Sequence, residues 1–203
     1  TPIPDTSGMN GRRGIWTASG DASYFQADNN ATGDQTTNNL SISFWYYPTS
    51  TVGTGARGYI INKFSGARGF DIHQLATRVL IIEIGDAGGS ITAPITAALP
   101  AGAWSFITIN YNRANNAYAF VNSVQDPILV DISARNGSIT VASPLSLYGW
   151  IGGVNFDVKN AALSEVLIAN GLTTLAEHQA AYKAFKVPTA SATPGIVGTP
   201  TYS

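Results

Sequence analysis

The stretch Leu40–Tyr47, with the sequence LSISFWYY, decides the fold. Every second side chain in it is large and apolar: Leu40, Ile42, Phe44 and Tyr46. Two serines, Trp45 and Tyr47 lie between them, so the stretch has the two-residue period of a β-strand. Pro48 follows and ends it, because proline cannot donate a hydrogen bond to a neighbouring strand. We therefore expect a strand here, with one apolar face.

Short segments of the same character fill the chain on both sides of this stretch. They are rich in Ile, Val, Phe, Tyr and Trp, and the 21 glycines and 10 prolines separate them. We expect further strands at 59–63, 69–75, 78–84, 90–96, 104–111, 117–121, 128–132, 138–141, 145–148 and 163–169. Many short strands at a spacing of roughly 8–12 residues are typical of a β-sandwich or barrel.

Two turns support this organisation. Residues 112–116, NRANN, join two aromatic-rich strands as a hairpin loop. Asn122 and Ser123 stand where a tight two-residue turn is expected, because asparagine tolerates a positive φ.

The segment after residue 173 has a helical pattern instead. Thr174 and Glu177 fit a capping box, in which the threonine and glutamate side chains bond backbone amides of the first turn. Four side chains then fall on one helical face: Leu175, His178, Tyr182 and Phe185. Pro188 closes the segment, which predicts a single C-terminal helix of about three turns.

Taken in order, several of these segments resemble one known family. They are 41–50 (SISFWYYPTS), 59–63 (YIINK), 69–75 (GFDIHQL), 99–112 (LPAGAWSFITINYN), 117–125 (AYAFVNSVQ) and 162–182 (ALSEVLIANGLTTLAEHQAAY). This ordered set resembles a laminin-G-like domain of the concanavalin A-like lectin/glucanase superfamily. The resemblance implies an all-β jelly-roll sandwich of two antiparallel sheets with one short C-terminal helix. Ser123 departs from the hairpin glycine common in that family, and Glu165 from its more usual aspartate.

The resemblance also divides the chain. We expect the laminin-G-like domain to occupy residues 14–187, with an N-terminal arm at 1–13 and an extended C-terminal arm at 188–203. Both arms are rich in Pro, Gly and Thr, like linkers. The chain begins at Thr1 without an apolar signal segment, and we expect it to be a processed or trimmed chain.

The shortage of charge narrows the function. Charged residues make up 11% of the chain, and the net charge is -1. A typical domain has roughly 25% charged residues, and nucleic-acid binding needs clustered Lys and Arg. No stretch approaches the about 20 apolar residues of a membrane-spanning helix. The absence of cysteine excludes disulfides and thiolate metal sites. We expect no nucleic-acid partner and no membrane insertion.

The acidic residues and histidines do not fit an enzyme. A retaining glycoside hydrolase needs two carboxylates about 5–5.5 Å apart, and glucanases space them as Glu-x-Asp-x-x-Glu. The nearest match, Glu83 to Asp86, lacks that spacing and the second glutamate. His73 and His178 are not near a serine-elbow motif. We therefore expect no catalytic residues, and a glycoside hydrolase is the remote alternative.

Two kinds of ligand site remain open. Calcium takes carboxylate and carbonyl ligands from loops, and the candidates are Asp21, Asp28, Asn155 and Asp157. The alternative is that these residues form turns. A glycan needs an exposed aromatic platform, and the candidates are Trp150, Tyr148, Tyr118 and Tyr47. Each of these rings has packing within the sandwich or at its rim as an alternative.

The arms and the low charge favour contacts between subunits. Ile196, Val197 and Tyr202 are the apolar anchors that a neighbouring subunit would bury, although the tail could equally lie on its own domain. We therefore expect a non-enzymatic structural protein of an extracellular assembly. A decoration or fibre component on a virion surface, packed against other subunits, is the first hypothesis. A carbohydrate-binding, lectin-like module, with or without calcium, is the alternative.

Overall fold

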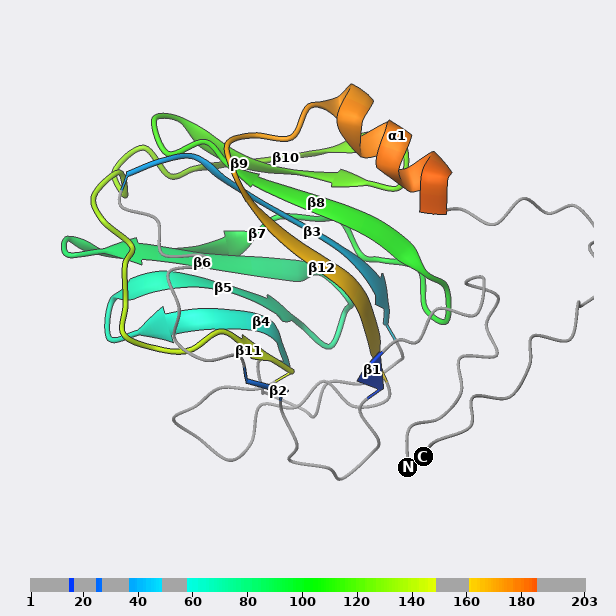
Figure 1. Ribbon diagram of the computed structural model, residues 1–203, viewed down its shortest axis with the longest axis horizontal. Helices are drawn as coiled ribbons and strands as arrows, with labels where there is room; N and C mark the ends of the chain where they lie inside the picture. Colours follow the sequence, from blue (N-terminus) through cyan, green and yellow to red (C-terminus); the bar gives the residue numbers. More distant parts are fainter. Residues whose placement is uncertain (1–14, 17–24, 27–36, 49–57, 149–160, 186–203) are drawn as a thin grey trace, which may run out of the picture.

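The computed structural model describes residues 15–16, 25–26, 37–48, 58–148 and 161–185. Their strands form two antiparallel sheets in two layers, and a helix lies outside the first sheet (Figure 1). The first sheet has the spatial order β1 (Ile15–Trp16), β12 (Ala162–Asn170), β3 (Leu40–Tyr47), β8 (Ser105–Tyr111), β9 (Asn116–Val121) and β10 (Val124–Asp131). The second sheet has the order β2 (Phe25–Gln26), β11 (Ser146–Leu147), β4 (Gly58–Ser65), β5 (Arg68–Gln74), β6 (Leu80–Asp86) and β7 (Gly89–Pro94). The helix is α1 (Leu175–Phe185). The expected jelly-roll sandwich with one short C-terminal helix is confirmed.

The core lies between the two sheets, and β3 supplies the side chains that its alternation predicts. Four of them are fully buried: Leu40, Ile42, Phe44 and Tyr46. They pack in one cluster with residues of the second sheet such as Ile60, Phe70, Ile72, Ile82 and Ile84. Each buried side chain of this size contributes about 1.5–3 kcal/mol relative to an exposed one. The Tyr46 hydroxyl donates to Gln74 at 2.6 Å, so the core polar group on β3 has a partner in the second sheet.

The two predicted turns are confirmed. The Asn115 amide donates to the Asn112 carbonyl at 2.8 Å and closes the loop between β8 and β9. Asn122 has a φ of 57° in the two-residue turn between β9 and β10, where Val121 pairs with Val124. Asparagine holds this left-handed conformation at low cost, which keeps the hairpin in register.

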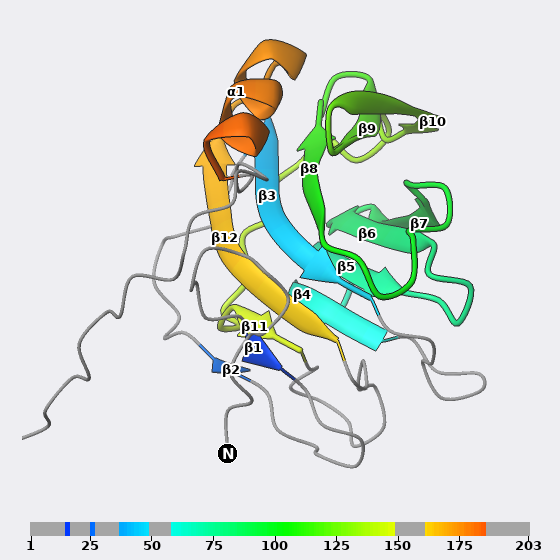
Figure 2. The ribbon, with the colours of Figure 1, turned by 90° about the vertical axis from the view of Figure 1, so that its right-hand side faces the viewer.

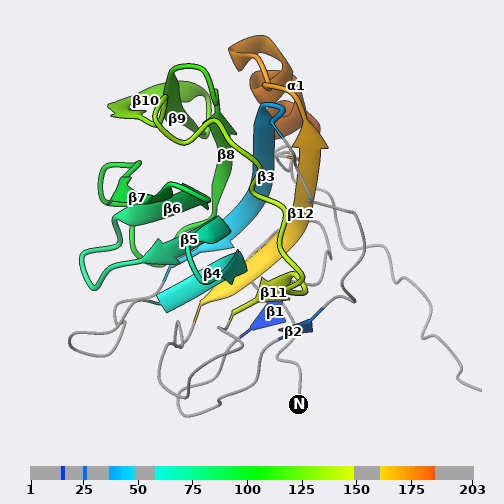
Figure 3. The ribbon, with the colours of Figure 1, turned by 90° about the vertical axis from the view of Figure 1, so that its left-hand side faces the viewer.

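The strand expected at 138–141 is wrong. Ile139 and Val141 are buried and alternate with the exposed Ser138 and Thr140, which is the pattern that suggested a strand. No β-ladder forms there. This segment belongs to the connection that leaves β10 of the first sheet and reaches β11 of the second, shown in yellow-green in Figure 3. Alternation alone cannot distinguish a strand from an extended connection along the edge of the core.

Side chains, rather than a neighbouring strand, form hydrogen bonds to the backbone of this connection. The buried Arg113 guanidinium donates to the carbonyl oxygens of Arg135, at 2.7 Å from Nε, and of Gly137. The Lys63 ammonium donates to the Ser143 carbonyl at 2.9 Å. The connection is therefore fixed to both sheets, because Arg113 follows β8 and Lys63 lies in β4.

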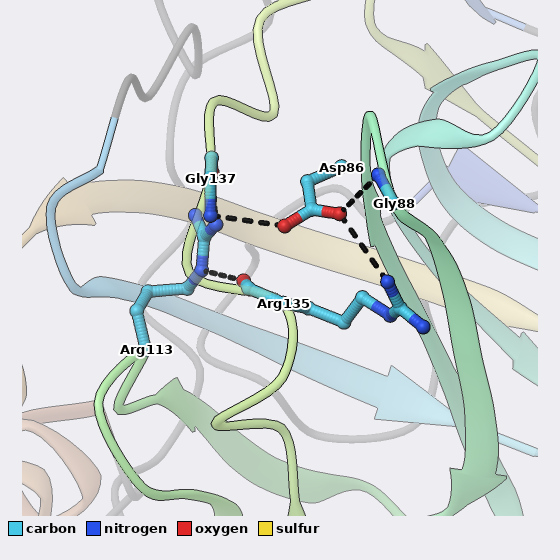
Figure 4. Close-up of polar contacts among 5 residues, drawn as sticks. All are labelled: Asp86, Gly88, Arg113, Arg135 and Gly137. Carbon is cyan, nitrogen blue, oxygen red and sulfur yellow. Dashed lines mark hydrogen bonds and ion pairs between the residues drawn. The ribbon is translucent and has the colours of Figure 1, made fainter.

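Asp86, at the end of β6, completes this attachment (Figure 4). Its carboxylate accepts from the amides of Gly88 at 2.8 Å and Gly137 at 2.9 Å, and Arg135 lies 3.5 Å away. Burial pushes the pKa of Asp86 upward, but these two amides and Arg135 outweigh burial and hold the pKa below its ordinary value. Asp86, Arg113 and Lys63, which are among the few charged residues in the chain, thus stabilise the fold.

Two short strands, β1 and β2, were not expected from the sequence. Each has two residues and pairs with a strand more than a hundred residues later: β1 with β12, and β2 with β11. A strand of only two residues is too short to show the alternation of side chains by which a strand is recognised in a sequence. No helix in the described part of the chain is long and apolar enough to cross a membrane.

Candidate binding groove

The capping box predicted at the start of α1 is present. The Thr174 amide and hydroxyl both donate to Glu177 Oε2 at 2.8 Å, and the Glu177 amide donates to Thr174 Oγ1 at 3.2 Å. The two bonds from Thr174 hold the pKa of Glu177 below its ordinary value. The helix therefore begins at a fixed point, directly after β12.

His178 docks α1 onto the outer face of the first sheet. Its side chain is fully buried. The imidazole stacks on Phe106 of β8, with ring centroids 4.9 Å apart, and contacts Phe120 of β9 at 5.4 Å. Nε2 bonds the Asn122 carbonyl oxygen, and Nδ1 lies 2.8 Å from the hydroxyl oxygen of Thr108. The helical face on which the sequence places His178 therefore packs against the sheet.

These contacts assign the imidazole protons. A carbonyl oxygen can only accept, so Nε2 carries the proton and Nδ1 accepts from the Thr108 hydroxyl. The Ser43 hydroxyl, 2.8 Å from Thr108 Oγ1, then donates to Thr108. Burial lowers the pKa of His178, and the bond to Asn122 offsets only part of this effect. His178 is thus a neutral docking group.

Further contacts fix the helix and the loop before it. Tyr182 packs on Trp45 of β3, with ring centroids 5.7 Å apart, and the Gln179 side-chain Nε2 donates to the Ser123 carbonyl at 2.8 Å. The Asn110 side chain accepts from the Thr173 amide at 2.8 Å and donates to the Thr173 carbonyl at 3.0 Å. The helix and the loop before it are therefore anchored to the outer face of the first sheet at several points.

A groove of about 610 Å³ lies between α1 and this outer face. Figure 2 shows α1 beside the upper ends of β12 and β3. Strands β3, β8 and β12 contribute Ser41, Ser43, Phe106, Thr108, Glu165, Val166, Leu167, Ala169 and Asn170. The loop and α1 contribute Gly171, Leu172, Thr173, Glu177, His178 and Ala181. A groove of this size is within the range of small-ligand pockets.

The lining mixes three kinds of chemistry. Hydroxyl groups come from Ser41, Ser43, Thr108 and Thr173, and apolar surface comes from Val166, Leu167, Leu172 and Ala181. Glu165 and Glu177, two of the three glutamates in the chain, supply carboxylates. Within the described residues, no lysine or arginine lines the groove. The site is suited to hold a ligand with apolar groups and a positive or neutral charge.

Glu165 lies at a β-bulge in the wall of the groove. The register between β12 and β3 shifts between Ser164 and Leu167, and Glu165 has a φ of 54°. A non-glycine residue in the left-handed region costs about 1–2 kcal/mol. Bulges of this kind are common beside functional sites, where they redirect a side chain. Glu165 lines the groove at this bulge.

Three of the predicted glycan residues, Tyr47, Tyr118 and Tyr148, lie within the described part of the chain. Tyr47 is half-buried with its ring 5.5 Å from Trp104, and Tyr118 is half-buried with its ring 5.5 Å from Phe120. Tyr148 is buried in the core, so its ring offers no exposed platform for a sugar. None of the three lines the groove. Trp150 lies outside the described residues.

The calcium candidates Asp21, Asp28, Asn155 and Asp157 lie outside the described residues, as do the arms and Ile196, Val197 and Tyr202. In the part of the chain that the structure describes, no three His, Asp or Glu side chains are placed to hold a metal ion.

Sequence reasoning did not identify the groove residues as a site. Ser43 and Thr108 are unremarkable strand residues, and they meet α1 only through the docking of His178. The unusual Glu165, which departs from the family pattern, was the one available signal.

The comparisons with known proteins agree with the fold. A family model described as the concanavalin A-like lectin/glucanases superfamily matches residues 19–177. A search of curated proteins found no match. Among solved structures, the binding domain of Paraclostridial Mosquitocidal Protein 1 is similar, with a TM-score of 0.72 and 17% identity over 88% of this chain and 44% of that one.

Two further solved structures are similar to the chain. The botulinum neurotoxin serotype G binding domain has a TM-score of 0.60 and 16% identity over 89% of this chain and 48% of that one. The binding domain of botulinum neurotoxin DC in complex with rat synaptotagmin II has a TM-score of 0.60 and 13% identity over 80% of this chain and 40% of that one. The chain therefore spans less than half the length of these structures, which share its fold.

Proposed function

We propose that this chain, which belongs to the concanavalin A-like lectin/glucanase superfamily, is a non-catalytic binding module that holds its ligand in the groove between α1 and the first sheet. The observation that carries the proposal is the groove itself. It is large enough for a ligand, and its walls are fixed by the buried His178 and Asn110 contacts. Preformed walls reduce the entropy lost on binding. The similar structures that are titled binding domains support the same role.

The polar side chains support a role without catalysis. In the groove, Nδ1 of His178 faces a hydroxyl and the opposite nitrogen, Nε2, bonds a backbone carbonyl, whereas in a Ser-His-Asp triad the imidazole nitrogen opposite the serine bonds a carboxylate. On the second sheet, Asp71 is buried against His73 at 2.6 Å, and Glu83 accepts from Ser90 at 2.8 Å. These carboxylates are engaged in structural contacts.

We further propose that the chain is a surface component of an extracellular assembly, such as a virion decoration or fibre. Strand β10 is an edge of the first sheet, and its side chains Val124 and Leu129 are 62% and 56% exposed. Apolar side chains on an edge strand favour contact with another subunit. The small number of charged residues favours the same kind of packing.

Carbohydrate is the second class of ligand. The hydroxyl groups in the groove and the half-buried rings of Tyr47 and Tyr118 on the same sheet favour it. Calcium dependence through Asp21, Asp28, Asn155 and Asp157 stays a prediction.

The test is a paired screen of the purified chain against a glycan array and a library of short random peptides, with and without a calcium chelator. We expect a ligand whose binding is lost in Leu167→Asp, which places a charge in the groove. Leu129→Asp on β10 is the matched control, because Leu167 and Leu129 are 61% and 56% exposed. Loss of binding in Leu129→Asp alone would instead assign binding to the β10 edge.

A further inference from the structure

The connection from β10 to β11 carries an asparagine followed by a glycine, Asn136–Gly137, on its surface. The Asn136 side chain is exposed, and the pair lies outside every helix and strand. Asparagine before glycine is the arrangement most prone to lose its side-chain amide, because glycine has no side chain to block attack by its own backbone nitrogen. Asparagine is for this reason among the thermally labile residues of proteins. The pair is therefore a candidate for covalent modification.

Two charged side chains hold the backbone on either side of Asn136 (Figure 4). The Asp86 carboxylate accepts from the Gly137 amide at 2.9 Å, and the Arg113 guanidinium donates to the Gly137 carbonyl. Arg113 also donates to the Arg135 carbonyl at 2.7 Å, so the residues before and after the asparagine are both fixed. Asp86 and Arg113 are buried, which limits competition by water for these bonds.

Deamidation needs the same nitrogen that Asp86 binds. The Gly137 nitrogen gives up its proton to solvent and bonds to Cγ of Asn136, while the side-chain nitrogen takes up a proton and leaves as ammonia. The product is a succinimide ring. A water molecule then opens the ring, which gives aspartate when it adds to the side-chain carbonyl and isoaspartate when it adds to the main-chain carbonyl. In the folded chain the N–H of Gly137 points at the carboxylate, so the nitrogen cannot approach Cγ unless that bond opens.

We propose that Asn136 is a deamidation site whose rate is set by the hydrogen bond between Asp86 and the Gly137 amide. The side chain keeps its amide while the bond is in place, and it is converted to aspartate and isoaspartate when the bond opens. Isoaspartate lengthens the main chain between the two carbonyls that Arg113 holds, so the conversion loosens the connection between the two sheets. The site lies outside the groove and does not depend on the ligand that the groove binds.

A second such pair in the described part of the chain, Asn170–Gly171, provides an internal control. Asn170 is exposed at the end of β12, and the Gly171 amide donates to the Asn39 backbone carbonyl at 2.8 Å. Because a main-chain carbonyl holds this amide, a change of the Asp86 side chain leaves its bond in place. General unfolding should speed deamidation at both pairs, whereas loss of the carboxylate should speed it at Asn136 alone.

The experiment incubates the full chain at mildly alkaline pH, as wild type and as Asp86→Ala. Mass spectrometry of the digested chain then gives the rates at Asn136 and Asn170 separately. We expect Asp86→Ala to speed the conversion of Asn136 about tenfold or more and to leave Asn170 near its wild-type rate. Asp86→Asn keeps a neutral acceptor and should give an intermediate rate. A synthetic peptide of residues 132–140 lacks the fold and should react about tenfold or more faster than the wild-type chain.

Three results would overturn the inference. They are an unchanged rate at Asn136 in Asp86→Ala, equal acceleration at Asn136 and Asn170, and a wild-type chain that reacts as fast as the peptide. Equal acceleration would assign the effect to general unfolding. If Asp86→Ala does not fold, the milder Asp86→Asn decides, because acceleration at Asn136 relative to Asn170 supports the proposal and equal rates contradict it.

Discussion

The Nδ1 atom of His178 lies 2.8 Å from the hydroxyl oxygen of Thr108, and this contact joins α1 to the outer face of β8. The imidazole is a neutral acceptor here, because its other nitrogen donates to the Asn122 carbonyl. One threonine hydroxyl is therefore among the groups that hold the wall of the groove.

Replacement of that hydroxyl should loosen the helix. Thr108→Val leaves Nδ1 without a donor in a buried position, which we expect to lower the free energy of unfolding by about 1–3 kcal/mol. Thr108→Ser is the control, because it keeps the hydroxyl. Urea denaturation followed by circular dichroism measures the difference. Equal stability of the two variants would contradict the assignment of the donor.

His178 should also make stability depend on pH. Burial lowers its pKa below the ordinary 6.5, so the unfolded chain binds a proton at a higher pH than the folded chain does. The docking of His178 contributes fully to the free energy of unfolding above pH 6.5. This contribution is lost as the pH drops through the lowered pKa of His178. His178→Phe keeps the ring stack and should flatten this dependence in unfolding measured from pH 8 to 5. An unchanged slope in His178→Phe would assign the effect to another group.

Asp86 should make the stability of the fold depend on pH in a more acidic range than His178 does. Its folded pKa is below the ordinary 3.8, so its contribution is present above that value and is lost as the pH falls through the lowered pKa. Asp86→Asn should reduce the free energy of unfolding at pH 7 by about 1.5–3 kcal/mol, because bonds to charged groups are the stronger ones. The difference from the wild type should shrink in acid. Asp131→Asn, at an exposed turn, is the control and should change stability much less.

The bulge at Glu165 gives a test of backbone strain. Glu165→Ala and Glu165→Gly both remove the carboxylate, but glycine accepts a φ of 54° without a steric cost. Glu165→Gly should therefore be more stable than Glu165→Ala by about 1 kcal/mol, as measured by thermal unfolding. The opposite order would show that the positive φ is not maintained in solution.

The sequence predicted the elements whose signals are local. The alternation in β3, the turn at Asn122 and the capping box at Thr174 each lie within a few residues, and each is confirmed. The expected strand at 138–141 was wrong because Arg113, far away in the sequence, binds the carbonyls of the preceding stretch. Local alternation cannot report such a contact.

The groove could not be predicted for a related reason. It exists because α1 packs on β8 and β9, so that His178 meets Thr108, Phe106 and Phe120 across many intervening residues. The sequence pointed to aromatic residues as sugar contacts, but one of them, Tyr148, is buried in the core. The groove is lined instead by serines, threonines and glutamates, whose role depends on the docking of the helix.

The central claim is that the chain binds its ligand between α1 and the first sheet, and its most direct test is the affinity of the selected ligand for two matched variants. Leu167 on β12 and Leu129 on β10 are 61% and 56% exposed, so an aspartate at either position should leave the fold intact. Isothermal titration calorimetry should show that L167D weakens binding about tenfold or more, while L129D stays near the wild type. Full affinity in L167D together with loss of binding in L129D would contradict the account.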